Sequence, residues 1–169
     1  VLEYSPFLER LVSNHPAWFD QLQASGRLQR HDPPPANDLE TKIAQYGLDA
    51  ALRRFRNREM LRLIWRDLNG LAPVEEILTD LSSLAEICLQ AAVNHHAGEV
   101  EMKRRPPRNP DGVAQKMVVI GLGKLGGFEL NLSSDIDVVF CYPQQGGCDG
   151  QRGLANEQFF TRLARSVIQ

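Results

Sequence analysis

A glycine-rich turn followed closely by two aspartates constrains this chain more than any other stretch. Residues 121–140 read GLGKLGGFELNLSSDIDVVF and come directly after an apolar run. The spacing of Gly121, Gly123 and Gly126 matches the G-x-G-x-x-G fingerprint with which dinucleotide-binding folds hold a pyrophosphate. The acidic residues that follow decide whether this interpretation holds.

The distance between the glycines and the acids argues against a dinucleotide-binding unit. Only Gly127 to Ser134 separate the last fingerprint glycine from Asp135, whereas a parallel crossover takes about a dozen residues or more. The acid that binds a ribose lies at the far end of the second strand, whereas Asp135 and Asp137 precede their apolar run. A P-loop is excluded as well, because the sequence contains no Gly-Lys-Ser or Gly-Lys-Thr.

The Asp135-Ile136-Asp137 run is better explained as a metal site. We expect a strand over residues 136–142, and alternate side chains of a strand share one face. Both carboxylates are then expected to point the same way, about 7 Å apart along the backbone. Mg²⁺ takes one or two protein carboxylates and completes its shell with water and phosphate oxygens.

The turn before the two aspartates has the chemistry of a phosphate site. Backbone N–H groups of a glycine-rich turn at a helix start bind phosphate, Lys124 adds a cation, and Ser133 and Ser134 add hydroxyl donors. A phosphate-binding turn followed by Asp-x-Asp predicts phosphoryl or nucleotidyl transfer. Simpler alternatives stay open: a solvated strand end for the acids, a tight turn for the glycines, and a surface position for Lys124.

The rest of the chain is predicted to be mostly helical. We expect two short helices in the first thirty residues, a Pro-rich connector at 31–38, and apolar stripes at 48–55 and 61–68. A helix is expected from Pro73 to about Ala97, where Gly98 permits an exit. Loops at 103–112 and 146–153, a strand at 117–120 and a helix from about 155 follow. The class is therefore α+β, with a helical segment over 1–112 and a mixed segment over 113–169.

The composition limits the kinds of binding partner and the cellular compartment that we expect. The formal net charge is −2, so there is no general electrostatic attraction to nucleic acid, and no apolar run is long enough to span a membrane. Three cysteines without C-x-x-C spacing favour reduced thiols and a cytoplasmic location. The arginine-rich run at 53–66 is interpreted as a solvated helix face, with docking of an acidic partner as the alternative. Because Val1 is the first residue and the last residues read as an unfinished helix, we expect a piece of a longer protein.

Residues 119–140, VIGLGKLGGFELNLSSDIDVVF, resemble the signature of the bifunctional glutamine synthetase adenylyltransferase/adenylyl-removing enzymes, a family of the nucleotidyltransferase superfamily. We call this stretch the signature run. Three further runs are similar to the same family: RRFRNREMLRLIWRDL (53–68), LSSLAEICLQAA (81–92) and NEQFFTRLARSVIQ (156–169). The resemblance covers residues 48–169.

The resemblance implies a fold and an activity. The fold is a helical layer packed on an incomplete nucleotidyltransferase core of the DNA polymerase β type. The family joins two such domains: the N-terminal one removes AMP from a tyrosine of glutamine synthetase by phosphorolysis, which gives ADP, and the C-terminal one attaches AMP from ATP. Glu129-Leu130-Asn131 with the Ser133 to Asp137 run resembles the removing copy. Adenylylation by ATP and a non-catalytic nucleotide sensor are the alternatives.

The resemblance also implies site residues and partners. Asp135 and Asp137 are the catalytic and metal-binding pair for Mg²⁺ or Mn²⁺, and the nucleotide-binding wall comprises Gly121, Gly123, Lys124, Gly126, Gly127, Ser133 and Ser134. Implied partners are glutamine synthetase, a PII-type signal protein, ATP or ADP, and phosphate. Two departures matter. The wider superfamily has Gly-Ser where this chain has Gly123-Lys124, and the third carboxylate of the family has no counterpart here. The isolated piece is therefore expected to be inactive.

Overall fold

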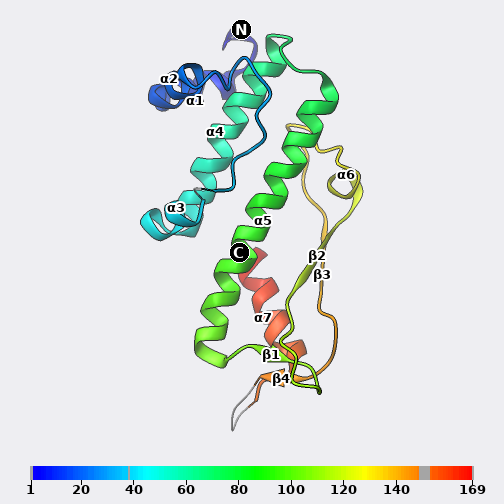
Figure 1. The fold of residues 1–169 in the computed structure, drawn as a ribbon. Helices are drawn as coiled ribbons and strands as arrows, with labels where there is room; N and C mark the ends of the chain where they lie inside the picture. Colours follow the sequence, from blue (N-terminus) through cyan, green and yellow to red (C-terminus); the bar gives the residue numbers. More distant parts are fainter. Residues whose placement is uncertain (1, 38, 149–152, 169) are drawn as a thin grey trace. The chain divides into compact units, whose positions relative to one another are not determined.

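Helices dominate the structure, a computed structural model that describes residues 2–37, 39–148 and 153–168 (Figure 1). The strands in these ranges form two small antiparallel pairs. This content confirms the α+β class, whereas the nucleotidyltransferase fold itself stays a prediction. None of the helices in the described ranges is long and apolar enough to cross a membrane.

The chain divides into two compact units. Unit 1 comprises Val1–Cys88 with Gly127–Asp135, and unit 2 comprises Leu89–Gly126 with Ile136–Gln169. The boundary between the units passes through one long helix and crosses the signature run twice. The separate division at residues 112 and 113 stays a prediction.

Unit 1 begins with a 3₁₀ turn, η1 (Leu2–Tyr4), and the two expected short helices, α1 (Pro6–Asn14) and α2 (Pro16–Ala24). The Ser5 hydroxyl caps α1 by accepting the Leu8 N–H at 3.2 Å. A proline stands at the start of both helices, where its missing N–H costs no hydrogen bond. The buried leucines of this region are Leu8, Leu11 and Leu22.

The Pro-rich connector carries no helix over residues 31–36, as predicted, and Asp38 lies outside the described residues. It leads into α3 (Leu39–Tyr46), a helix that the sequence analysis missed, and then into α4 (Leu48–Leu68). The two apolar stripes belong to α4 as one continuous helix. Gly47, at φ +79°, separates α3 from α4 because this left-handed conformation suits glycine best.

The longest helix, α5 (Val74–Arg104), begins after Pro73 as predicted but does not end near Ala97. It continues through Gly98, which faces open space. A glycine within a helix costs about 1 kcal/mol relative to alanine. Ala97 and Val100 pack against an apolar cluster of unit 2, and this packing outweighs the local cost.

In unit 2, β2 (Val118–Gly121) pairs with β3 (Val138–Cys141) in antiparallel register, with Val118 opposite Cys141 and Gly121 opposite Val138. Both predicted strands are present, but β3 begins two residues later than the expected 136. Parallel neighbours are required in a dinucleotide-binding βαβ unit. The antiparallel register therefore confirms that the glycine fingerprint does not belong to such a unit.

A second antiparallel pair, β1 (Pro107–Arg108) with β4 (Gly147–Cys148), lies in segments predicted to be loops. Residues 149–152 of the second predicted loop lie outside the described residues. The terminal helix α7 (Asn156–Ile168) is confirmed. Its buried Asn156 Nδ2 donates to the carbonyls of Arg108 at 3.0 Å and Gln144 at 3.1 Å. The buried apolar cluster beside it comprises Cys148, Phe159, Phe160 and Leu163.

Candidate nucleotide and metal site

The glycine turn in unit 2 is tightly constrained by its own backbone. It follows β2 and forms a single helical turn, α6 (Gly123–Gly126). A Cβ atom on Gly126 would lie 2.6 Å from the Gly121 carbonyl oxygen, and Gly123 has φ +52°. Leu125 is buried and anchors the turn, while Lys124 beside it is exposed. Two fingerprint glycines are thus required by the geometry of the turn itself.

Asp137 borders this turn. Its carbonyl oxygen accepts the Leu122 N–H at 2.8 Å, which extends the β2–β3 ladder by one bond. A Cβ atom on Gly123 would lie 3.9 Å from Asp137 Oδ2. Unit 2 therefore brings Gly121, Gly123 and Gly126 together with the second aspartate.

The remaining predicted residues lie in unit 1, in the segment Gly127–Asp135, which we call the signature loop. Leu130 is buried, and its N–H donates to the Ser82 hydroxyl of α5 at 3.3 Å. Ser133 and Ser134 are grouped around Asn131: its Oδ1 accepts the Ser134 hydroxyl at 2.6 Å. Asp135 follows directly and is exposed.

The local geometry corrects one step of the strand argument. Residues 134–137 carry no regular secondary structure, because β3 begins at Val138. Strand alternation therefore does not apply to Asp135 and Asp137, and Ile136 is exposed. The shared metal pair and the joining of the two parts into one site stay predictions.

The donor set fits a hard divalent cation. Asp135 and Asp137 are both exposed, and within the described ranges neither carboxylate forms an ion pair. Carboxylates not already neutralised by an internal cation are the oxygen ligands that Mg²⁺ and Mn²⁺ prefer. The chemistry of each aspartate is thus compatible with the predicted role of metal ligand.

A second cluster of possible metal ligands lies in unit 1 and has a different environment from the two aspartates. His31, Glu76 and Asp80 place ligand atoms within 4.8 Å of one another. Arg62 Nη2 donates to Asp80 Oδ2 at 2.8 Å, and Arg66 Nη2 donates to Glu76 Oε1 at 2.8 Å. Because each carboxylate already has a guanidinium partner, these acids are explained as members of ion pairs, in which Asp80 is buried and Glu76 is half-buried.

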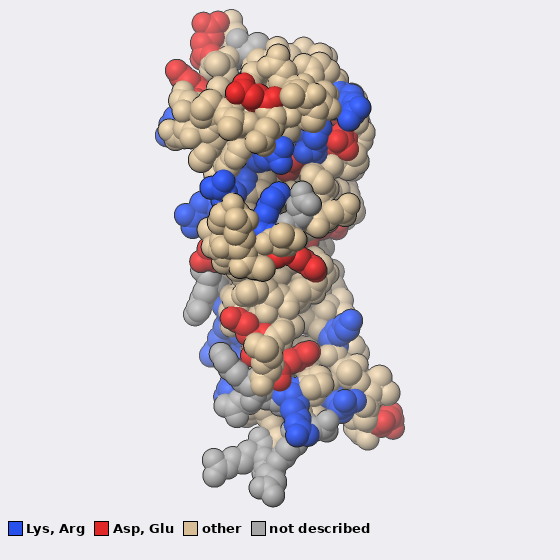
Figure 2. All heavy atoms as spheres, turned by 60° about the vertical axis from the view of Figure 1, so that its left-hand side comes forward, with Lys and Arg blue, Asp and Glu red and all other residues tan. Residues whose placement is uncertain are grey.

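The arginine-rich run is only partly a solvated face. Arg53, Arg54 and Arg56 are exposed as expected, and Figure 2 shows Lys and Arg side chains gathered on the face of unit 1 that carries α1 to α4. The expectation is wrong for Arg62 and Arg66, which are 0% and 2% exposed. They are buried because carboxylates of α5 compensate their charges across the helix pair.

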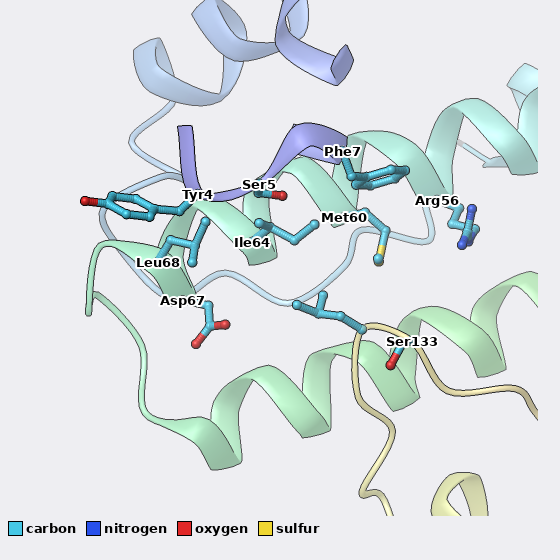
Figure 3. A pocket seen from close by; sticks show the side chains of 10 residues that line it. Tyr4, Ser5, Phe7, Arg56, Met60, Ile64, Asp67, Leu68 and Ser133 are labelled. Atoms are coloured by element: carbon cyan, nitrogen blue, oxygen red, sulfur yellow. The ribbon is translucent and has the colours of Figure 1, made fainter. Parts of the chain in front are cut away.

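A cavity of about 360 Å³ adjoins the signature loop within unit 1 (Figure 3). Most of its lining is apolar, with the charged side chains of α4 at opposite ends in the view. The lining residues are Tyr4, Ser5, Phe7, Arg56, Met60, Ile64, Asp67, Leu68, Leu132 and Ser133. Ser133 therefore lies beside an apolar surface, and the cavity does not by itself identify a phosphate site.

Two residues of the loop escaped the sequence analysis. Asn131 accepts hydrogen bonds from both serines, and an asparagine in a polar turn, where its side chain can accept the backbone N–H two residues on, is a known signal that could have revealed it. Phe128 has φ +56°, an uncommon conformation for a bulky residue. No sequence signal indicates that strain. Burial raises the pKa of the Cys88 thiol to about 11, so the protonated thiol is the favoured form at neutral pH.

Comparison with known proteins covers the whole chain. Residues 1–169 match the family described as glutamate-ammonia ligase adenylyltransferase. The "bifunctional glutamine synthetase adenylyltransferase/adenylyl-removing enzyme" of Nitrosococcus oceani is 44% identical over 173 residues, which covers 98% of this chain and 18% of that protein. Proteins with the same name from Thioalkalivibrio sulfidiphilus and Pseudomonas aeruginosa are 39% identical over 98% of this chain and 48% identical over 78%. The chain spans 18% and 14% of those two relatives.

Proposed function

We propose a function from one premise: the chain belongs to the glutamate-ammonia ligase adenylyltransferase family. The names of its relatives join attachment and removal of an adenylyl group with glutamine synthetase. The chain carries the first part of a nucleotidyltransferase domain that removes AMP from a modified tyrosine of glutamine synthetase. Inorganic phosphate is the acceptor, and ADP is the product.

One observation carries the proposal: Asp137 lies beside the glycine turn. Antiparallel pairing of β2 with β3 brings the end of one strand next to the beginning of the other. A phosphate group bound by the turn would therefore lie close to a carboxylate, Asp137, whose Oδ2 faces Gly123. This is the arrangement in which a protein can bind phosphate and hold a metal beside it.

The reaction exchanges one phosphorus–oxygen bond for another. An oxygen of phosphate forms a bond to the phosphorus of the AMP group, and the bond from that phosphorus to the tyrosine oxygen breaks. The tyrosine leaves as a phenolate and takes a proton from water. Mg²⁺ or Mn²⁺, when bound, supplies charge neutralisation at the reacting phosphorus and at the leaving oxygen. No general base of this chain is required.

The chain's own residues bind and orient the phosphate groups. Asp135 and Asp137 are the metal ligands. The backbone N–H groups of the turn bind phosphate because glycine allows close approach, and Lys124 adds a positive charge at its edge. The remaining residues of the nucleotide-binding wall are Gly121, Gly123, Gly126, Gly127, Ser133 and Ser134.

A second candidate function is the opposite reaction, attachment of AMP from ATP to the tyrosine. The word adenylyltransferase in the names of the relatives favours it. The same metal ligands and the same phosphate-binding turn would serve, because the bond to tyrosine that breaks in removal is the one that forms in attachment. Residues Glu129 to Asp137 favour removal, since they resemble the removing copy of the family.

The proposed partners follow from the family. They are glutamine synthetase, a PII-type signal protein, ATP or ADP, and phosphate, in the cytoplasmic regulation of nitrogen metabolism. A formal net charge of −2 favours protein partners over nucleic acid.

The test uses the full-length protein with adenylylated glutamine synthetase and phosphate, without ATP. We expect equal amounts of ADP and unmodified glutamine synthetase. Asp137→Asn should lower this rate by about 100-fold or more, because the substitution removes a ligand of the metal that would neutralise charge at the reacting phosphorus. Asp111→Asn removes another exposed carboxylate of unit 2 and should leave the rate unchanged.

The other outcomes separate the alternatives. If no ADP is released and glutamine synthetase is modified only when ATP is present, the protein attaches AMP. If the wild-type protein shows neither activity and Asp137→Asn still binds nucleotide, a non-catalytic sensor is favoured.

A further inference from the structure

Asn131 is the hydrogen-bonding centre of the signature loop. Its Oδ1 accepts the hydroxyl of Ser134 at 2.6 Å, the N–H of Ser133 at 3.3 Å and the hydroxyl of Ser133 at 3.4 Å. Its own N–H donates to the Ser134 hydroxyl oxygen at 3.2 Å, and its carbonyl accepts the Ser134 N–H at 3.2 Å. Three bonds therefore join Asn131 to Ser134.

The two serines differ in how strongly the loop holds them. A serine hydroxyl has one proton to donate. The proton of Ser134 goes to Asn131 Oδ1 at 2.6 Å, a short bond, whereas the bond from the Ser133 hydroxyl is 3.4 Å long and weak. Ser134 is thus committed to the turn, and only the Ser133 hydroxyl can turn to a ligand at small cost.

The base of the loop is fixed, so a change at Asn131 acts on the residues after it. Leu130 is 4% exposed, and its N–H donates to the Ser82 hydroxyl. Ser82 is fully buried and donates in turn to the Leu78 carbonyl at 2.8 Å. The chain enters the turn from an anchored residue and leaves it at Ser134, directly before Asp135.

We infer that Asn131 is a positioning residue that acts through Ser134 on the metal ligand Asp135. The inference rests on the proposed function, since it takes Asp135 as a metal ligand. The bonds between Asn131 and Ser134 restrict the backbone of Ser134, which directly precedes Asp135. Less of the ordering of the Asp135 carboxylate then has to take place when the metal binds. Preorganisation of this kind lowers the entropic cost of binding. In this inference Ser134, which the resemblance assigns to the nucleotide-binding wall, acts there by holding the turn and not by contacting phosphate.

The hydrogen-bond pattern defines the variants. Within the described ranges the side-chain amide of Asn131 acts only as an acceptor. Aspartate keeps this acceptor in the same shape, and leucine removes it at nearly the same volume. Asn131→Leu is therefore the disrupting variant, and Asn131→Asp is the rescuing one. Asn94→Leu makes the same chemical change on an exposed turn of α5 and is the control.

The measurement is the dissociation constant of Mn²⁺ for the full-length protein with ADP, followed by electron paramagnetic resonance. We expect Asn131→Leu and Ser134→Ala to weaken Mn²⁺ binding about tenfold, which corresponds to about 1.4 kcal/mol. Asn131→Asp and Asn94→Leu should stay within about threefold of wild type. Thermal unfolding identifies a variant that fails to fold, and Ser134→Ala then carries the test because it deletes a single atom.

Unchanged Mn²⁺ affinity in both Asn131→Leu and Ser134→Ala would overturn the inference. A rise in the KM for phosphate in Ser134→Ala, without a change in Mn²⁺ affinity, would also overturn it, because Ser134 would then contact phosphate directly. Failure of the proposed function is read from a different variant. Retention of full activity and Mn²⁺ affinity in Asp137→Asn would reject the metal site itself.

Discussion

Glu59 shows how buried side chains of opposite charge compensate one another in the interior of unit 1. Its carboxylate is 1% exposed and accepts Arg27 Nη1 at 2.8 Å and Arg62 Nε at 2.8 Å. Arg62 continues to Asp80, and His31 Nε2 lies 3.2 Å from the same carboxyl group. A charge is tolerated in the interior only when opposite charges and hydrogen bonds compensate it. Glu59 is therefore the most sensitive member of the network, since two guanidinium groups depend on it.

We predict that Glu59→Gln destabilises the chain by about 3–5 kcal/mol, because Arg27 and Arg62 each lose one of their two carboxylate partners in a buried site. Urea unfolding of the 169-residue chain measures the change. Glu86→Gln removes an exposed carboxylate of α5 and should change stability by no more than about 0.5 kcal/mol. Equal effects of the two substitutions would show that the buried network contributes nothing specific.

At the scale of elements, α5 shows where a local rule and tertiary packing disagree. Gly98 is a reasonable helix end by local chemistry, yet α5 runs to Arg104. Ala97 and Val100 on either side of it pack against the cluster of Phe159, Phe160 and Leu163. At about 25 cal/mol per Å², burial of about 40 Å² of apolar surface offsets the cost of about 1 kcal/mol for one glycine in a helix.

The environment of Gly98 predicts a stabilising substitution. Gly98→Ala should stabilise the chain by about 0.5–1 kcal/mol, because the glycine is helical and a Cβ atom there meets nothing within 4 Å. Gly112→Ala is the matched control. It also meets nothing within 4 Å, but its φ of +79° disfavours alanine, so stability should fall. Thermal unfolding of both variants measures the opposite signs, and a loss of stability in Gly98→Ala would contradict this account of α5.

At the scale of the whole molecule, the chain covers a small part of its relatives. It spans 18% of the Nitrosococcus oceani protein, and a third carboxylate that the family resemblance implies has no counterpart in its sequence. The two aspartates of this chain are two of the three carboxylates that the resemblance implies. The complete site is therefore expected only in the full-length protein.

We predict that the 169-residue chain alone releases no measurable ADP from adenylylated glutamine synthetase, under conditions in which the full-length protein does. Coupled detection of ADP measures both, and circular dichroism of the short chain confirms that it is folded. A rate within tenfold of the full-length protein would show that the two aspartates suffice.

The sequence by itself determined the helical content, the positions of β2 and α7, and the rejection of a dinucleotide site, because these depend on periodicity, turn chemistry and spacing. Its signature run also indicated the family. Other features depend on residues far apart in the chain, which no local pattern specifies. Burial of Arg62 requires Asp80 of another helix, the length of α5 requires the aromatic cluster, and the approach of Asp137 to Gly123 requires the register of β2 with β3. Only the tertiary structure decided these, because each is stabilised by contacts that exist only once the distant segments have met.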